Sequence, residues 1–427
     1  MSTTPTPSRR AEVSSADVQA SESAADTYKE ALRSEFDHST VLFLLGAGAS
    51  HDGGLPLSRQ ITQLALADLA LTETPDFGNG IELALRYVCG ALIKYDTDRG
   101  GSPSDLPDIE LVVSAVELLS QKDLLQVSPF VDAWDPMVDK TSPSPFPAGF
   151  DNQFDKVVGG GGSAEQLLRQ AIRAEIGKGN ARIWDELRAH LVRDLRKRVL
   201  IPDIAEFSYL APLVALGGRR NGVTIVTLNY DLSIELQAQH LGISCDTGIQ
   251  SWIAGSEVLW QPGGLHLLKL HGSIGWSFFD QRSEPGRLAE GLFLVADANV
   301  RGSRPAVVFG QREKLRAEGP FLEIFGEFRR RLALSSLLVV VGYSFRDQHV
   351  NETIRHWING DTSRRIIVID PDFPPPWRGS SSRDFDFRHE LNQALLPRRL
   401  PGQAPPVPFR LDVVRKTAKE GLADLGL

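Results

Sequence analysis

The chain has 427 residues, of which 42% are hydrophobic and 23% are charged, enough for one large domain with an insertion or for two domains. Its formal net charge of −8 at pH 7 argues against a nucleic-acid-binding surface that extends over the whole protein. The two cysteines, Cys89 and Cys245, are far apart in sequence, which excludes a disulfide framework and a cysteine-based zinc site and suits a reducing cytoplasm.

The first 24 residues contain few large apolar side chains and are predicted to form a disordered, mobile tail. They are rich in Ser, Thr and Ala and do not resemble a signal peptide. No apolar stretch in the chain approaches the roughly 18 to 20 residues that a membrane-spanning helix needs. We therefore expect a soluble, cytoplasmic protein. A short amphipathic helix is predicted from Ala25 to Phe36.

Five apolar residues, Val41 to Leu45, lead directly into Gly46-Ala47-Gly48-Ala49-Ser50. Such a run is typical of a parallel strand that is covered on both faces, and the two glycines would let backbone N–H groups approach a phosphate. A dinucleotide-binding fingerprint would place a third glycine where His51 stands. On these residues alone, an ordinary strand-to-helix turn is the alternative.

The chain after Pro75 has a different pattern, which we interpret as a helical insertion over residues 75–201. Apolar residues recur at helical spacing over 58–71 before it, and over 81–95, 109–119 and 164–200 within it. Residues 127–163 contain a series of prolines and glycines and are predicted to be a mobile surface loop.

Basic residues crowd the last turns of this insertion: Arg188, Arg193, Arg196, Lys197 and Arg198. A solvated helix end is the expected reason, because cations are favourable near a helix C-terminus. Contact with a partner or a nucleic acid is the alternative.

Further apolar runs alternate with helical segments and predict the strands Val223 to Thr227, Leu265 to Leu270, Ala306 to Phe309, Leu337 to Val341 and Ile366 to Ile369. This alternation is typical of an α/β protein with a Rossmann-like, doubly wound parallel sheet. Ligands of such sheets bind beyond the carboxyl ends of the strands. One residue follows each of five strands there, which predicts a single nucleotide pocket: Gly46, Asn229, His271, Gly342 and Asp370.

Residues 373–427 form a predicted C-terminal extension with Pro- and Ser-rich connections. A strand is possible from Phe409 to Val414, followed by an amphipathic helix to Leu427.

Several of these motifs resemble, in the same order, those of the sirtuin family. The loop from Gly46 to Arg59 resembles the sirtuin cofactor loop GAG-x-S-x-x-x-G-I-P-D-F-R, and Thr227-Leu228-Asn229-Tyr230-Asp231 resembles T-Q-N-x-D. Leu270-His271-Gly272-Ser273 is similar to the histidine-glycine step of the family, and Gly342-Tyr343-Ser344-Phe345 is similar to G-T-S-L. The resemblance covers residues 40–72 and 205–372, which implies an NAD-binding catalytic domain built from 25–74 and 202–372.

The resemblance implies that NAD is bound as a substrate, and it assigns roles to residues at the matching positions. The implied cofactor-binding residues are Gly46, Ala47, Gly48, Ser50, Pro56, Arg59, Asp231, Gly342, Ser344 and Asp370. Asp231 could orient Asn229 or its loop. Asp370 would accept hydrogen bonds from the adenosine ribose, and a simple turn before Pro371 is its alternative.

Asn229 and His271 are the implied catalytic residues, and their chemistry suits the cleavage of NAD+. Nicotinamide leaves as a neutral group, so the protein must position and stabilise rather than protonate it. The amide of Asn229 can hold a water or the ribose hydroxyls without adding charge. His271, with an ordinary pKa of about 6.5, could take a proton from a hydroxyl or from water. For Asp347, helix N-capping is at least as good an explanation as catalysis.

The chain also departs from the sirtuin deacylases. Leu57 and Ser58 replace the aspartate and phenylalanine of the cofactor loop, and Leu228 replaces the glutamine. No four-cysteine zinc module exists, so no zinc is expected. Residues 307–311 resemble only faintly the V-V-F-F-G-E substrate strand, and the acidic residue is missing.

These departures make the chain similar to the bacterial sirtuin-like NAD hydrolases of antiphage defence. That resemblance implies an NAD+ glycohydrolase that releases ADP-ribose and nicotinamide, acting as an antiviral effector of abortive infection by NAD+ depletion. It also implies a homo-oligomer and, by analogy with related systems, a partner such as a HerA-like hexameric ATPase. The alternatives are an NAD+ or ADP-ribose sensor without turnover, and an NAD-dependent protein deacylase or ADP-ribosyltransferase.

Overall fold

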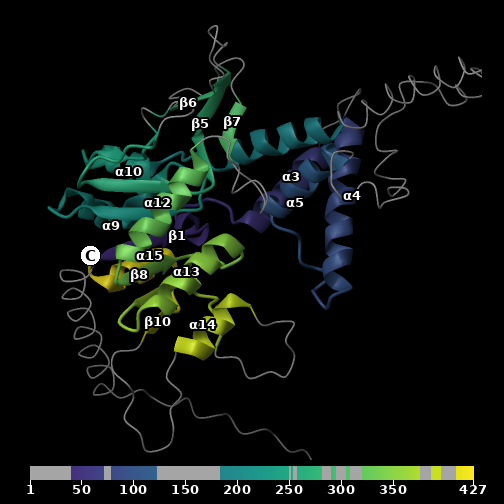
Figure 1. The fold of residues 1–427 in the computed structure, drawn as a ribbon. Coiled ribbons are helices and arrows are strands. Elements are labelled where there is room, and N and C mark those ends of the chain that lie inside the picture. The colour runs from purple at the N-terminus through teal and green to yellow at the C-terminus, as the bar shows by residue number, and fades with distance from the viewer. Residues whose placement is uncertain are drawn as a thin grey trace, which may run out of the picture.

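A computed structural model of the chain describes residues 40–71, 78–122, 183–249, 252, 257–280, 290–294, 304–307, 320–375, 386–395 and 410–427. A parallel sheet with the strand order β10-β9-β8-β1-β2-β4-β3 forms its centre (Figure 1). The strands are β1 (Val41–Leu45), β2 (Val223–Thr227), β3 (Cys245–Asp246), β4 (Leu265–Lys269), β8 (Leu337–Val341), β9 (Arg365–Ile369) and β10 (Leu411–Val414). Every pair of neighbours in this sheet is parallel, which confirms the predicted Rossmann-like fold class.

The chain changes direction across the sheet at β1. From β1 it continues to β2 and β4 on one side, and β8, β9 and β10 are added on the other side. Leu45, the last residue of β1, is opposite Thr227 of β2 and Val341 of β8. The carboxyl ends of the central strands are therefore level with one another, at the position where doubly wound sheets bind ligands.

Both faces of the sheet are covered, as the continuous apolar strands predicted. Leu42 and Leu44 lie in one core with α12 (Phe321–Leu334), α13 (Gln348–Gly360) and α14 (Phe387–Leu395). Phe43 and Leu45 lie in a second core on the opposite face. The elements of that face are η3 (Ile204–Leu210), α9 (Ala211–Ala215), η4 (Leu216–Gly218), α10 (Ser233–His240) and α15 (Ala418–Leu425).

The predicted insertion contains a helical group with its own core. It comprises α4 (Gly78–Thr97), α5 (Ile109–Ser120) and a helix over 183–198, and it packs with α3 (Ser58–Leu71) beside the sheet (Figure 1). Val112 and Trp184 are fully buried in this core, which also includes Tyr230 from the end of β2. The predicted helices over 58–71, 81–95 and 109–119 are thus confirmed. The predicted tail, the helix from Ala25 to Phe36 and the loop 127–163 lie outside the described residues.

One predicted strand was assigned to the wrong sheet. The run from Ala306 overlaps β7 (Arg304–Val307), which pairs antiparallel with β5 (Gly272–Asp280) in a second sheet completed by β6 (Glu290–Leu294). Four apolar residues are compatible with either sheet, because the pairing partner and not the strand itself decides the direction. The residues after Val307 in this run lie outside the described part of the chain.

The C-terminal residues complete the main sheet. β10 adds parallel to β9, and α15 packs on β9 and next to α2 (Gly48–His51). The carboxylate of Asp52, just after α2, accepts a hydrogen bond from the backbone N–H of Lys419 at 2.7 Å. The end of the chain therefore supports the turn that follows β1.

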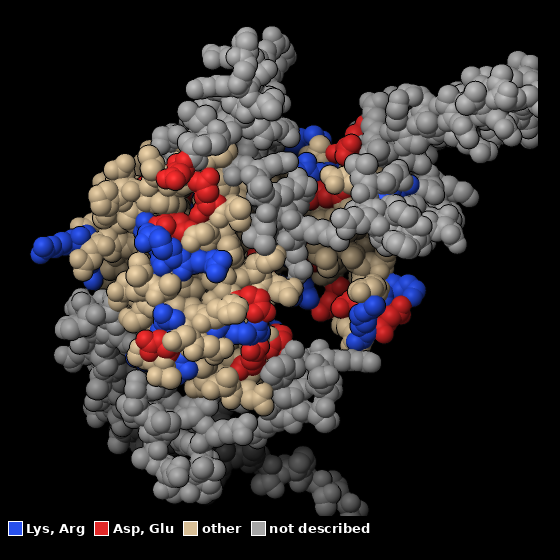
Figure 2. Space-filling model, in the orientation of Figure 1, with Lys and Arg blue, Asp and Glu red and all other residues tan. Residues whose placement is uncertain are grey.

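Charged side chains of both signs intermingle on the visible surface of the described residues (Figure 2). In the helix over 183–198, where the basic residues of the insertion lie, Arg188 pairs with Glu117, and Arg198 pairs with Asp194 and Asp68. These ion pairs favour the solvated helix end over a nucleic-acid contact. Among the helices that the structure describes, none has the length and apolar character needed to cross a membrane.

Candidate functional site

The residues predicted from the strand ends come together at one edge of the sheet. Asn229 and His271 each lie two residues beyond a pair of hydrogen-bonded neighbours, Thr227 of β2 and Lys269 of β4. Gly46 follows β1, Gly342 follows β8, and Asp370 follows β9, and these strands are consecutive in the sheet. The parallel sheet thus brings together residues that are separated by more than three hundred positions in the sequence.

The glycine loop packs directly against the end of β8. The backbone N–H groups of Gly46 and Gly48 donate to the carbonyls of Val341 and Gly342, each at 2.9 Å. A Cβ on Gly46 would lie 2.6 Å from the Gly342 oxygen, and one on Gly342 would lie 2.4 Å from the backbone of Ala49. Gly342 also has a φ of +59°. These glycines are therefore required for the close approach of two loops, whatever ligand the loops receive.

Asn229 is held by the glycine loop through a short chain of hydrogen bonds. Its Nδ2 donates to the Gly46 carbonyl at 2.8 Å and to Ser50 Oγ at 3.1 Å. The Ser50 hydroxyl donates in turn to Asp231 Oδ2 at 2.8 Å. Asp231 Oδ1 accepts from the backbone N–H of Ser233 at the start of α10. The amide orientation of Asn229 is thereby fixed by donors and acceptors on two neighbouring loops.

Lys269, the last residue of β4, contacts this group and is almost completely buried. Its ammonium group donates to the Asp231 carbonyl at 2.5 Å and to Glu235 Oε1 at 2.8 Å. Burial raises the pKa of Glu235, and the lysine opposes that shift. Lys269 therefore ties the loop after β2 to the strand that carries His271.

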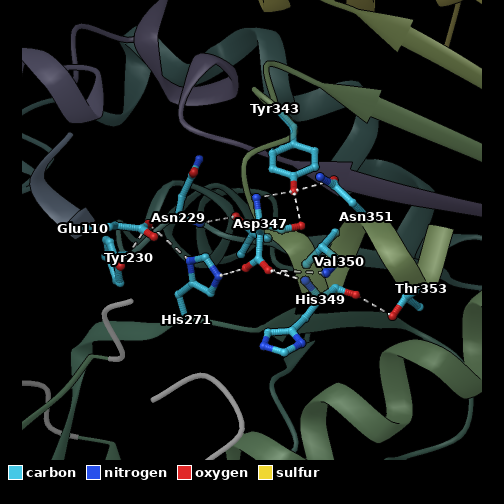
Figure 3. Close-up of polar contacts among 11 residues, drawn as sticks. Glu110, Asn229, Tyr230, His271, Tyr343, Asp347, His349, Val350, Asn351 and Thr353 are labelled. Atoms are coloured by element: carbon cyan, nitrogen blue, oxygen red, sulfur yellow. Dashed lines mark hydrogen bonds and ion pairs between the residues drawn. The ribbon is translucent and has the colours of Figure 1, made fainter. Parts of the chain in front are cut away.

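His271 pairs with Asp347 at the start of α13. The side chain of His271 is 3% exposed, and its Nε2 lies 2.9 Å from Asp347 Oδ2 (Figure 3). The other oxygen of Asp347 accepts the backbone N–H groups of His349 and Val350, so the same carboxylate caps the helix. Helix capping and contact with His271 are thus both functions of Asp347.

Glu110, from the first turn of α5, approaches the opposite side of the imidazole. Its Oε1 lies 3.4 Å from His271 Nδ1 and accepts a hydrogen bond from the Tyr230 hydroxyl at 3.2 Å (Figure 3). Burial, together with the Glu110 carboxylate, raises the pKa of Tyr230 well above its usual value. The tyrosine therefore remains a neutral hydrogen-bond donor.

Sequence analysis overlooked Glu110 and Tyr230 as site residues. Tyr230 stands at the variable position of the Thr227 to Asp231 motif, and Glu110 lies far away in an insertion of helical pattern. The available signal was weak: Asp108 precedes an apolar helical run, as an N-cap does, which places Glu110 in the first helical turn. Nothing in the sequence indicates which element that turn faces.

The remaining predicted cofactor-binding residues lie around Asn229 and His271 and make contacts with other residues. Ala47 and Pro56 are half-buried in the loop between β1 and α3, and Ser344 is exposed after β8. Arg59 pairs with Asp105 across the surface at 3.0 Å. Asp370 accepts the backbone N–H of Asp372 at 2.9 Å, as a turn-forming aspartate does, and burial raises its pKa.

The described residues also form a cavity at the opposite end of the sheet. A cavity of about 380 Å³ opens at the amino ends of the strands, where Thr224 and Trp260 line it, and its Arg331 already pairs with Glu327. Within the described part of the chain, no group of three or more His, Cys, Asp or Glu side chains is placed to hold a metal ion.

One family model matches part of the chain. Residues 223–389 match the model of a family described as SIR2-like domain, a span that includes Asn229, His271, Gly342 and Asp370. The glycine loop after β1 lies outside that match. No curated protein matches the chain.

Solved structures of Sir2 homologues are similar to the chain at low identity. A Sir2 homologue in complex with NAD has 15% identity and a TM-score of 0.37, over 95% of this chain and 91% of that one. A Sir2 homologue mutant in complex with 2'-O-acetyl ADP-ribose has 15% identity and a TM-score of 0.35, over 90% of this chain and 89% of that one. The fold class itself rests on the strand order and register.

Proposed function

We propose that the protein is an NAD+ glycohydrolase that uses water to cleave NAD+ into ADP-ribose and nicotinamide. One observation carries the proposal: Asn229 and His271 lie at matching positions beyond β2 and β4, each with its own polar partners, at the edge that holds the glycine loop. Support also comes from the SIR2-like match over residues 223–389 and from the Sir2 homologue solved with NAD.

Asn229 positions the reacting groups in this proposal. Both of its described donations use Nδ2, which leaves the amide oxygen to accept a hydrogen bond from a water or a ribose hydroxyl. The bond between the anomeric carbon and the nicotinamide nitrogen breaks, and its electron pair leaves with neutral nicotinamide. A neutral amide suits an oxocarbenium-like centre, because it orients the nucleophile and takes no part in proton transfer.

His271 is the proton acceptor. The carboxylate of Asp347 accepts a hydrogen bond, so His271 donates from Nε2 and keeps the lone pair on Nδ1. Nδ1 is buried and faces Glu110 Oε1 at 3.4 Å, so substrate binding has to open a path from the attacking water to this nitrogen. As the water oxygen bonds to the anomeric carbon, one water proton passes to Nδ1 and is later released to solvent. The overall change is NAD+ plus water to ADP-ribose, nicotinamide and a proton.

The cofactor-binding part of the proposal uses the loops that meet beyond β1, β8 and β9. Gly46, Ala47, Gly48, Ser50 and Pro56 would line the ribose and phosphates from one loop, and Gly342 and Ser344 from the other. Asp370 would contact the adenosine ribose. Arg59 would leave its ion pair with Asp105 and contact a phosphate. Asp231 would act through Ser50, which it already holds.

We further propose that the protein is a cytoplasmic effector of bacterial antiphage defence that depletes NAD+ in infected cells. Such an activity must be held off in healthy cells, and residues 75–201 are the proposed regulatory or assembly element. A homo-oligomer, and a partner such as a HerA-like hexameric ATPase, belong to this proposal by analogy.

The first experiment incubates the purified full chain with NAD+, alone and with the products of neighbouring genes, and separates the products by chromatography. Nicotinamide and ADP-ribose should appear with the wild type. Asn229→Ala and His271→Ala should lose at least about a hundredfold in rate. His240→Ala, an exposed histidine at the end of α10, is the matched control and should keep full activity.

Tight NAD+ binding without product under every condition would contradict the hydrolase and favour the sensor. Transfer of ADP-ribose or removal of an acyl group from a peptide would favour the transferase or deacylase instead.

A further inference from the structure

The two ring nitrogens of His271 face carboxylates from two different parts of the chain. Asp347, from the sheet domain, is 2.9 Å from Nε2, and Glu110, from the helical insertion, is 3.4 Å from Nδ1. Tyr230 is the third titratable group at this position, with its ring centroid 6.2 Å from that of His271. The environment of the imidazole is therefore completed by a residue outside the motifs of the sheet.

The two carboxylates cannot act in the same way on a neutral ring. When Nε2 donates its proton to Asp347, Nδ1 carries a lone pair and has nothing to donate to Glu110. The Glu110 contact becomes a charge-assisted hydrogen bond only when Nδ1 is protonated. Glu110 therefore interacts most favourably with the imidazolium, the state that follows proton transfer to His271.

Glu110 is held in place by contacts that join the N-termini of two helices. The Tyr230 hydroxyl donates to it, and Asp108 caps α5 through the backbone N–H of Leu111 at 2.9 Å. The second oxygen of Asp108 pairs at 3.1 Å with Arg346, the neighbour of Asp347 in the sequence. The start of α5 is thus linked to the start of α13, with His271 between Glu110 and Asp347.

We propose that Glu110 is a positioning residue for His271, which orients the imidazole and stabilises it after Nδ1 has accepted a proton. This inference rests on the proposed hydrolase function. It makes the helical insertion part of the active site, because correct docking of α5 is needed to supply the second carboxylate. Any event that moves α5 away from the sheet would then lower the activity through His271.

The test replaces Glu110 by glutamine in the full chain and measures kcat and KM for NAD+ between pH 5 and pH 9. Glu110→Gln keeps the size and the oxygen acceptor for Tyr230 but removes the charge. We expect kcat to fall roughly tenfold with little change in KM. The acidic limb of the kcat/KM profile should move to lower pH by about one unit, because an opposite charge near the base is lost.

Glu82→Gln is the matched control, because Glu82 lies on α4 of the same helical group and pairs with Arg86 on its own helix. It should leave both kcat and the pH profile unchanged. An unaltered profile in Glu110→Gln, or an equal loss of activity at every pH, would overturn the proposal and leave Glu110 a purely structural role.

A measurement without turnover separates this inference from the proposed function. The ring nitrogens of His271 can be followed by ¹⁵N-histidine NMR, with the signal assigned from its loss in His271→Gln. In Glu110→Gln the imidazole should lose its proton at a lower pH than in the wild type. An inactive wild type that shows this shift would refute only the hydrolase, whereas an active wild type without the shift would refute only the role of Glu110.

Discussion

The groups around Asn229 and His271 lie side by side at the sheet edge but are assembled in different ways. Asn229 is held by Gly46 directly after β1 and by Ser50 in the short helix α2, and Ser50 is held in turn by Asp231 in the loop after β2. His271 is held by Asp347, which begins a helix of the sheet domain, and by Glu110 in the first turn of α5, a helix of the insertion. The first group therefore depends on the sheet and on the segments packed at its edge, whereas the second depends also on how the insertion is docked.

We infer from this difference that the Asn229 group is the more rigid of the two. The Asn229 group is braced by backbone contacts between loops whose glycines leave no space for adjustment. The Glu110 contact joins α5 to the loop after β4 and is supported by the partly exposed pair of Arg346 and Asp108. Changes in the two groups should consequently have different effects on activity and on stability.

The largest expected effect is on catalysis by the His271 group. Asp347→Asn keeps an oxygen to cap α13 but presents an amide to His271, which would reverse the tautomer and place the proton on Nδ1. We expect kcat to fall by roughly 10²- to 10⁴-fold. Asp347→Ala should lose similar activity and also about 1 kcal/mol of stability with the cap. Kinetics and urea denaturation of both variants test this prediction, and full activity of Asp347→Asn would refute it.

Lys269 connects the two groups, and its removal should damage both. Lys269→Met would leave the partly buried carboxylate of Glu235 without its partner and free the Asp231 carbonyl. The free energy of unfolding should fall by about 3 to 5 kcal/mol, as expected for breaking a buried ion pair. The double variant with Glu235→Gln should recover much of that loss in urea denaturation. Equal stability of the single and double variants would contradict the pairing.

The contact between the two glycine loops should be nearly as sensitive. Gly342→Ala combines a positive φ with a Cβ only 2.4 Å from backbone atoms of the other loop. We expect a loss of about 2 to 4 kcal/mol in the free energy of unfolding. Gly326→Ala in α12 is the control, since a Cβ there meets no atom within 4 Å. It should stabilise the protein by about 0.5 to 1 kcal/mol, and a similar result for both variants would argue against the close approach.

The smallest effect is expected at the edge of the site, where stability and binding should move in opposite directions. Burial raises the pKa of Asp370, so its charged form costs stability at neutral pH. Asp370→Asn keeps the turn and should raise the free energy of unfolding at pH 7 by less than about 1 kcal/mol. The gain should vanish as the pH falls below the usual carboxyl range, where Asp370 is protonated in both states. NAD+ affinity, measured by calorimetry, should decrease, and unchanged affinity would remove Asp370 from the cofactor site.

Much of the Asn229 group could be predicted because its signals are local. An apolar run followed by glycines indicates a buried strand and a tight turn, and residues after parallel strands must meet at one edge. Gly46, Asn229, His271, Gly342 and Asp370 were placed together on that reasoning. Asp347 was recognised as a cap, but its second oxygen, which faces His271, has no signature in the sequence.

By itself the sequence determined the parallel strands, their carboxyl-end loops and the helical character of the insertion, because hydrophobic periodicity and glycine positions are properties of short segments. Only the tertiary structure decided that β7 joins an antiparallel sheet, that β10 completes the main one, and that Glu110 reaches His271. These facts depend on which surfaces pack together across long stretches of chain. No local pattern records that choice, since an apolar strand pairs in either direction and an acidic first turn suits any helix.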